Sequence, residues 1–356
     1  MQTKTILPIW LSVISVLTAA ALAGCNETTK ETPALATEAR QALDTMVAEA
    51  GQVMALMDAR RAPNSPEYVQ VRLDWIERQF DSQLLQHPES KAVLIEERGR
   101  RVQAIRAELE QRPTLEAPRA TLAMAQFGTA EAALLRALEQ KAADEQRRAR
   151  DDMASAATHA YAAITEADAT HAQAVPWRTL KAKWLWRAAN ASLATTPRDL
   201  NPETVANQWI NTAQISMDGA TARSPGGTPF PEAFGLARLQ SLKAAMHKND
   251  AAVHSAAAAM VDAARVGVQF LDNSPAASSA ATPDFTNTYI DWSKKAMDAE
   301  WLLSADAQAR TAAVEAHAAR LRARAAKNAG VTADELSRHM LAFALAEADY
   351  HRATLK

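Results

Sequence analysis

Apolar residues recur with a helical period along nearly the whole chain from about residue 37 onward. In the clearest stretch the apolar positions are separated by four, three, four and four residues, which places them on one face of a helix. This face comprises Val69, Leu73, Ile76, Phe80 and Leu84. Residues that favour strands do not cluster in alternating runs. The pattern therefore predicts an all-α fold.

Prolines, glycines and capping residues divide this pattern into separate helices. In the first half, three helices are predicted between residue 37 and Pro113. In the second half, the predicted helices occupy residues 176–193, 202–217, 231–248, 250–272, 285–328 and 333–355. Thr332 and Glu335 form a capping-box pair at the start of the last of these.

The stretch from Thr129 to Ala174 contains neither proline nor glycine, and nine of the fourteen residues from Glu139 to Asp152 are charged. Such a segment is expected to be solvated on most sides. The prediction is one long helix that bridges two packed regions. The alternative is a pair of helices that meet near Asp151 and Asp152.

These elements predict a multi-helix bundle of antiparallel helices with one long bridging helix, and an irregular α-solenoid is the alternative. The chain is divided into an N-terminal helical region, 37–174, and a C-terminal helical region, 175–356. The best internal echo pairs Ala182–Leu185 with Ala299–Leu302, and it does not extend into a fixed period.

The first residues show a different pattern. A short polar start with one positive side chain, Lys4, precedes an apolar run from Ile6 to Ala21, as in a secretory signal peptide. The run ends in Leu22-Ala23-Gly24-Cys25, which resembles the lipobox of bacterial lipoproteins. The resemblance covers the first 25 residues.

The lipobox resemblance implies that residues 1–24 are removed as a signal peptide and that the thiol of Cys25 is acylated, so that membrane lipid is the first partner. Two or three acyl chains give durable anchoring, since each buried methylene contributes about 0.8 kcal/mol. Asn26 in place of an aspartate favours the outer membrane, with the protein facing the periplasm. Residues 25–36 are polar and contain Pro33, which is typical of a flexible tether.

Composition and charge exclude several classes of protein. The formal net charge of -2 argues against a general nucleic-acid binder. A single cysteine excludes an intrachain disulfide and a metal site built from several cysteines.

Few residues suggest chemistry. Glu347 and His351 are four positions apart and could share a proton or a metal ion, but such a pair on a solvent-facing helix surface is the ordinary outcome. His159, Glu166 and His171 are not spaced to align as three ligands. The loop Ser224-Pro225-Gly226-Gly227-Thr228 lacks the lysine of a phosphate-binding loop. No catalytic residue, metal site or cofactor is predicted, and the protein is not expected to be an enzyme.

A basic cluster lies near one helix end and comprises Arg320, Arg322, Arg324 and Lys327. Positive side chains there complement the helix dipole. The functional alternative is contact with anionic lipid headgroups.

The tryptophan-rich segment is the most informative for binding. Trp177, Leu180 and Trp184 share one helix face, whereas Trp186 points about 200° away from Trp184. Either this helix is sandwiched between two packed layers, or Trp186 is exposed beside Lys183 and Arg187. The second arrangement makes these three residues the candidate partner-binding surface, because Trp and Arg are enriched at interaction hot spots.

The leading functional hypothesis is a lipid-anchored periplasmic protein that binds a protein partner in the cell envelope, as a scaffold or accessory factor. One alternative is a small-ligand binder with a cleft between the two helical regions. Another is an enzyme that acts on an envelope polymer through carboxylates.

Overall fold

The computed structural model describes residues 37–60, 65–112, 117–168, 174–196, 200–223, 229–273, 283–304, 306–329 and 334–355. Over these residues the protein is all-α, and no strand is present in them. The predicted fold class is therefore confirmed. No described helix is both long and apolar enough to cross a membrane. The predicted signal peptide, Cys25 and the tether 25–36 lie outside the described residues.

Twelve α-helices are found in these ranges, and neighbouring helices pack antiparallel. They are, in chain order, α2 (Thr37–Ala59), α3 (Pro66–Gln86), α4 (Lys91–Glu110), α5 (Pro118–Glu139), α6 (Ala143–Glu166), α8 (Val175–Thr195), α9 (Pro202–Arg223), α10 (Phe230–Met246), α11 (Asp250–Asn273), α12 (Pro283–Leu303), α13 (Ala307–Ala329) and α14 (Glu335–Thr354), with a short 3-10 helix, η1 (Pro88–Ser90), before α4. Ser65 caps α3 by accepting a hydrogen bond from the backbone of Tyr68, and Pro66 is its first residue, as predicted.

The prediction of one long bridging helix is wrong, because α5 ends at Glu139 and α6 begins at Ala143. Lys141 adopts a left-handed conformation with φ of 55°, and the backbone N–H of Ala142 donates to the carbonyl of Ala137 at 2.9 Å. This is the hydrogen bond of a Schellman cap, which usually employs glycine. Because a lysine occupies the left-handed position, the sequence contains no visible stop.

Two further boundaries differ from the prediction. The interval 285–328 is divided between α12 and α13. The N-cap of α14 is Asp334, whose side chain accepts a hydrogen bond from the backbone of Leu336, whereas the predicted cap, Thr332, lies outside the described residues.

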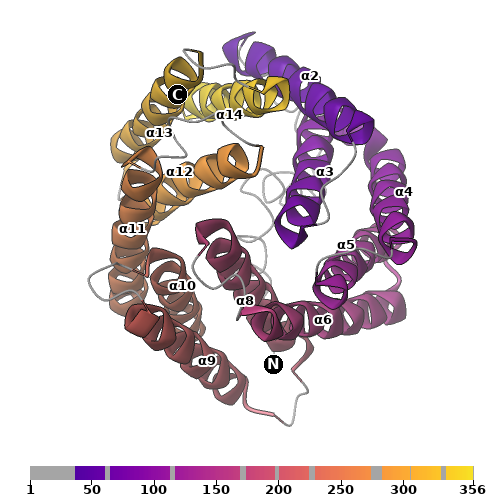
Figure 1. Cartoon of the computed structure of the whole chain (residues 1–356), viewed down its shortest axis with the longest axis vertical. Helices are drawn as coiled ribbons and strands as arrows, with labels where there is room; N and C mark the ends of the chain where they lie inside the picture. Colours follow the sequence, from indigo (N-terminus) through magenta and orange to yellow (C-terminus); the bar gives the residue numbers. More distant parts are fainter. Residues whose placement is uncertain are drawn as a thin grey trace, which may run out of the picture.

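The chain closes into a ring (Figure 1). Each helix packs against the next along the chain, and the last, α14, packs against α2. Side chains fasten this closure: Arg60 donates to Asp334 at 2.7 Å, and His339 lies 2.6 Å from Glu49. Three helices, α3, α8 and α12, point into the centre of the ring and contact one another there.

The ring is built from three consecutive four-helix units, α2–α5, α6–α10 and α11–α14. The second helix of each unit is one of the central helices, and each carries a fully buried tryptophan: Trp75, Trp184 and Trp292, which are 109 and then 108 residues apart. The fourth helix of each unit carries a buried phenylalanine: Phe127, Phe234 and Phe343. The unit therefore has a length of about 108 residues, a period that the sequence search did not detect.

The contacts of these residues follow the same order around the ring. Each indole N–H donates to the residue five positions before the tryptophan of another central helix, and the pairs are Trp75–Asn287 (3.0 Å), Trp184–Gln70 (2.8 Å) and Trp292–Thr179 (3.1 Å). Each tryptophan also meets, edge to face, the phenylalanine of the preceding unit, in the pairs Trp75–Phe343, Trp184–Phe127 and Trp292–Phe234, with centroid separations of 5.2, 5.3 and 5.5 Å. The ring thus has an approximate threefold axis through its centre.

The predicted division at residue 174/175 falls between α6 and α8. These two helices pack against each other within the second unit. The ring continues across this position, so we describe the molecule by its three units rather than by two regions.

Candidate functional site

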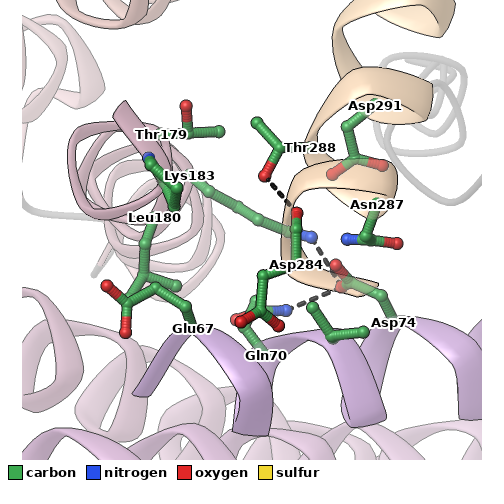
Figure 2. A pocket seen from close by; sticks show the side chains of 12 residues that line it. Glu67, Gln70, Asp74, Thr179, Leu180, Lys183, Asp284, Asn287, Thr288 and Asp291 are labelled. Carbon is green, nitrogen blue, oxygen red and sulfur yellow. Dashed lines mark hydrogen bonds and ion pairs between the residues drawn. The ribbon is translucent and has the colours of Figure 1, made fainter. Parts of the chain in front are cut away.

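A pocket lies on the threefold axis, between the N-terminal halves of α3, α8 and α12 (Figure 2). Each of these helices contributes the same four positions, which are eight, five, four and one residues before its buried tryptophan. The lining residues are Glu67, Gln70, Val71 and Asp74 from α3, Pro176, Thr179, Leu180 and Lys183 from α8, and Asp284, Asn287, Thr288 and Asp291 from α12. The pocket is therefore a product of the internal repetition.

Ion pairs close the inner end of the pocket. The Nζ of Lys183 donates to Asp74 at 2.5 Å, the amide of Gln70 donates to the same carboxylate at 2.6 Å, and Arg78 donates to Asp291 at 2.6 Å. Burial by itself would raise the pKa of Asp74, but the charges of Lys183 and Arg187 outweigh it and lower that pKa. This end of the pocket is satisfied internally and holds the three helices together.

The mouth of the pocket is different. Here the three equivalent positions are Glu67, Pro176 and Asp284, so two carboxylates face each other without an equivalent cation (Figure 2). The Oδ1 atom of Asp284 is buried and has no hydrogen-bond partner in the described structure. Burial, with a further contribution from the charge of Glu67, raises the pKa of Asp284 to about 6. The carboxylate is thus ionised at neutral pH but poorly stabilised.

The pocket is small. The space that water can enter is about 30 Å³, enough for about two water molecules. It can accept the end of a side chain or a small charged group, and any larger part of a ligand would have to lie outside the mouth.

A layer of three cations lies one turn deeper than the ion pairs. Arg78, Arg187 and Lys295 each follow their tryptophan by three residues and sit over its ring, at 4.9, 4.9 and 4.3 Å from the centroid. Burial lowers the pKa of Lys295 to about 8, because Asp291 raises it only in part and Lys183 opposes it. Threefold symmetry would place an acid where Lys183 stands, so the interface of Lys295 lacks the partner that Arg78 has.

The predicted partner-binding surface is not exposed. Trp186 is 6% accessible and packs with Leu236 and Leu239 of α10, while the guanidinium of Arg238 lies 4.0 Å from its ring centroid. Because α8 is packed between the centre and the outer helices, both of its indoles find a core, which is the sandwiched arrangement that the sequence left open. The exposure predicted for Trp186 is therefore wrong, and the burial predicted for Trp184 is confirmed.

The two charged members of that predicted surface serve internal contacts. Lys183 is bound to Asp74, as described above. Arg187 lies over the rings of Trp184 and Phe127 and 3.7 Å from Glu77.

Glu347 and His351 are buried, so the expectation of a solvent-facing pair is wrong. Lys294 forms a short ion pair with Glu347. Although burial would raise the pKa of Glu347, the charges of Lys294 and His351 lower it to about 2. Burial lowers the pKa of His351 to about 4, so this histidine is neutral at pH 7.

The other candidates carry no chemistry in the described structure. His159 is exposed, and His171 and the loop 224–228 lie outside the described residues. No group of three His, Cys, Asp or Glu side chains that could hold a metal ion occurs in the described ranges.

The axial residues were not singled out from the sequence. Their signal is a buried tryptophan preceded by a charged residue and followed three positions later by Arg or Lys, in Asp74-Trp75, Lys183-Trp184 and Asp291-Trp292. Three short matches more than 100 residues apart become significant only when the helices are seen to converge.

Comparison of the chain with protein-family models, with curated proteins and with solved structures gave no match. The argument for function therefore rests on the geometry.

Proposed function

We propose that this protein is a lipid-anchored binding protein of the bacterial cell envelope, and that it receives a cationic side chain of a protein partner in the axial pocket. The observation that carries the proposal is the mouth of the pocket, where Asp284 and Glu67 stand together and Oδ1 of Asp284 has no partner. A carboxylate in this setting is stabilised by an ammonium or guanidinium group. Since the pocket admits only the end of such a group, the remainder belongs to a larger molecule outside.

The location in the envelope rests on the lipobox resemblance of Leu22-Ala23-Gly24-Cys25. We expect Cys25→Ala to abolish incorporation of a fatty-acid analogue, because the thiol is the acceptor of the lipid. Labelling of cells that express the wild-type and variant proteins measures this. Label that persists in the Cys25→Ala protein would show that the anchor is misassigned.

The pocket is tested with a defined probe, Nα-acetyl-lysine amide, and binding to the full chain is followed by ligand-observed NMR. We expect Asp284→Asn to weaken binding about tenfold, the effect of losing one charge-assisted hydrogen bond. Because the pKa of Asp284 is raised to about 6, binding to the wild-type protein should fall as the pH drops below 6 and the carboxyl becomes neutral.

Two controls make this test specific. Asp262→Asn removes the same charge from an exposed position on α11 and should leave binding unchanged. A probe acetylated on the side-chain amine should not bind. If the wild-type protein fails to bind the lysine probe, or binds it equally after Asp284→Asn, the axial pocket is not a cation site.

A further inference from the structure

The basic cluster of α13 is divided between two faces. Arg322 is exposed and lies 3.6 Å from Asp349. Arg324, two residues later, turns inward against α12, and its side chain is completely buried, with an accessibility of 0%. The sequence places these arginines side by side, whereas the fold gives them opposite environments.

Arg324 has no hydrogen-bond partner in the described structure. Its Nε and both terminal nitrogens are buried and unpaired. Its guanidinium is held only by aromatic rings, 4.6 Å from the centroid of Phe285 and 5.4 Å from that of Tyr289. Five N–H donors of a charged group are thus removed from water with nothing to accept them, which is one of the most unfavourable arrangements in a protein interior.

A second unpaired donor lies one helical turn away. Asn328 is 5% accessible, and its amide nitrogen has no partner in the described residues. Arg324 and Asn328 are four positions apart, so their side chains project from the same face of α13. The two groups together offer only donors, which indicates that the missing group is an acceptor.

The nearest carboxylate does not fill this role. The charge of Asp272 opposes the effect of burial on Arg324, yet burial still lowers the pKa of Arg324. Asp272 itself lies 3.8 Å from Lys327 and interacts with the hydroxyl of Tyr289. Its charge is therefore shared among several groups.

An open groove lies beside this site, between α11, α12 and α13. It has a volume of about 520 Å³, and its lining includes Asp272, Arg265 and Arg320. Arg320 is one turn before Arg324 on α13, so the groove reaches the neighbourhood of the buried guanidinium. Its size suits a small organic anion and its headgroup.

We propose that Arg324 and Asn328 bind a phosphate group that enters from this groove, either as a free phosphate or as part of a lipid headgroup. The planar guanidinium can donate two parallel hydrogen bonds to phosphate oxygens, and the amide of Asn328 can donate a third. A phosphate group offers enough acceptors for both side chains and for Arg320 at the rim. This site is separate from the axial pocket, so its failure would leave the proposed cation site standing.

The test is the thermal unfolding midpoint of the full chain. Inorganic phosphate at about ten times its dissociation constant should raise the midpoint by about 2–4 °C over chloride at equal ionic strength. Soluble dihexanoyl phosphatidylglycerol, compared with dihexanoyl phosphatidylcholine, distinguishes the sources. A rise with inorganic phosphate indicates free phosphate, and a rise with phosphatidylglycerol alone indicates a headgroup.

Variants locate the effect. Arg324→Gln should abolish the rise, while the control Arg322→Gln, which removes the same charge from the exposed face, should keep it. If Arg324→Gln does not fold, Asn328→Asp provides an internal carboxylate one turn from Arg324; it should raise the midpoint without added anion and abolish the response. An absent rise in the wild-type protein, an equal rise with chloride, or a response that survives these variants overturns the proposal.

Discussion

Replacing Trp184 with alanine should lower the free energy of unfolding by about 3–5 kcal/mol. The indole is fully buried, donates to Gln70 of α3 and meets the ring of Phe127 edge to face at 5.3 Å. Its removal leaves a cavity on the threefold axis and an unpaired amide oxygen. Urea unfolding followed by circular dichroism measures the change.

The internal symmetry provides the controls for this prediction. Trp75→Ala and Trp292→Ala should be similarly costly, because their indoles make the equivalent contacts. Trp209→Ala should cost clearly less, since Trp209 on α9 is only partly buried. A cost for Trp184→Ala no larger than that for Trp209→Ala would mean that the axial tryptophans do not hold the ring together.

Glu347→Ala is also expected to cost about 3–5 kcal/mol, because it leaves the ammonium of Lys294 buried without its carboxylate. The stabilisation should depend on pH. The pKa of Glu347 is lowered to about 2 from an ordinary value of 4.5, so its contribution is present above pH 4.5 and is lost as the pH falls toward 2. Urea unfolding across this range measures both effects.

A double variant separates this ion pair from the packing around it. Lys294→Met combined with Glu347→Leu should recover most of the stability, since a well-packed apolar pair replaces a buried ion pair at little cost. Glu315→Ala, which breaks a half-exposed pair with Arg352, should change stability by less than about 1 kcal/mol. If Glu347→Ala is as mild as Glu315→Ala, the Lys294–Glu347 pair contributes little.

The sequence was a good guide to local structure and a poor guide to charged residues. A helical period is set by side chains three and four positions apart, so it survives in any stretch of sequence. Whether a charged side chain is exposed depends on the helix that packs over it. Glu347 looked like a surface residue because its buried partner, Lys294, is 53 residues away.

The hidden repeat shows the same limit. Only a few positions, such as the central tryptophans and the phenylalanines that meet them, are retained in all three units, because alanine and other small apolar residues satisfy most helix contacts equally well. The break at Lys141 is hidden for a related reason, since its left-handed cap lacks the usual glycine. Another lysine, Lys248, adopts a left-handed conformation between α10 and α11, at the next unit boundary.

The sequence by itself determined that the described chain is helical, where most of its helices lie, and that Trp184 shares a buried face with Trp177 and Leu180. Only the tertiary structure decided that the helices close into a ring and that three of them converge on an axis. It also decided that Trp186 is covered, that Asp284 faces Glu67, and that Arg324 is buried beside the exposed Arg322. The physical reason is that helix formation depends on neighbours along the chain, whereas burial and charge pairing depend on groups that only folding brings together.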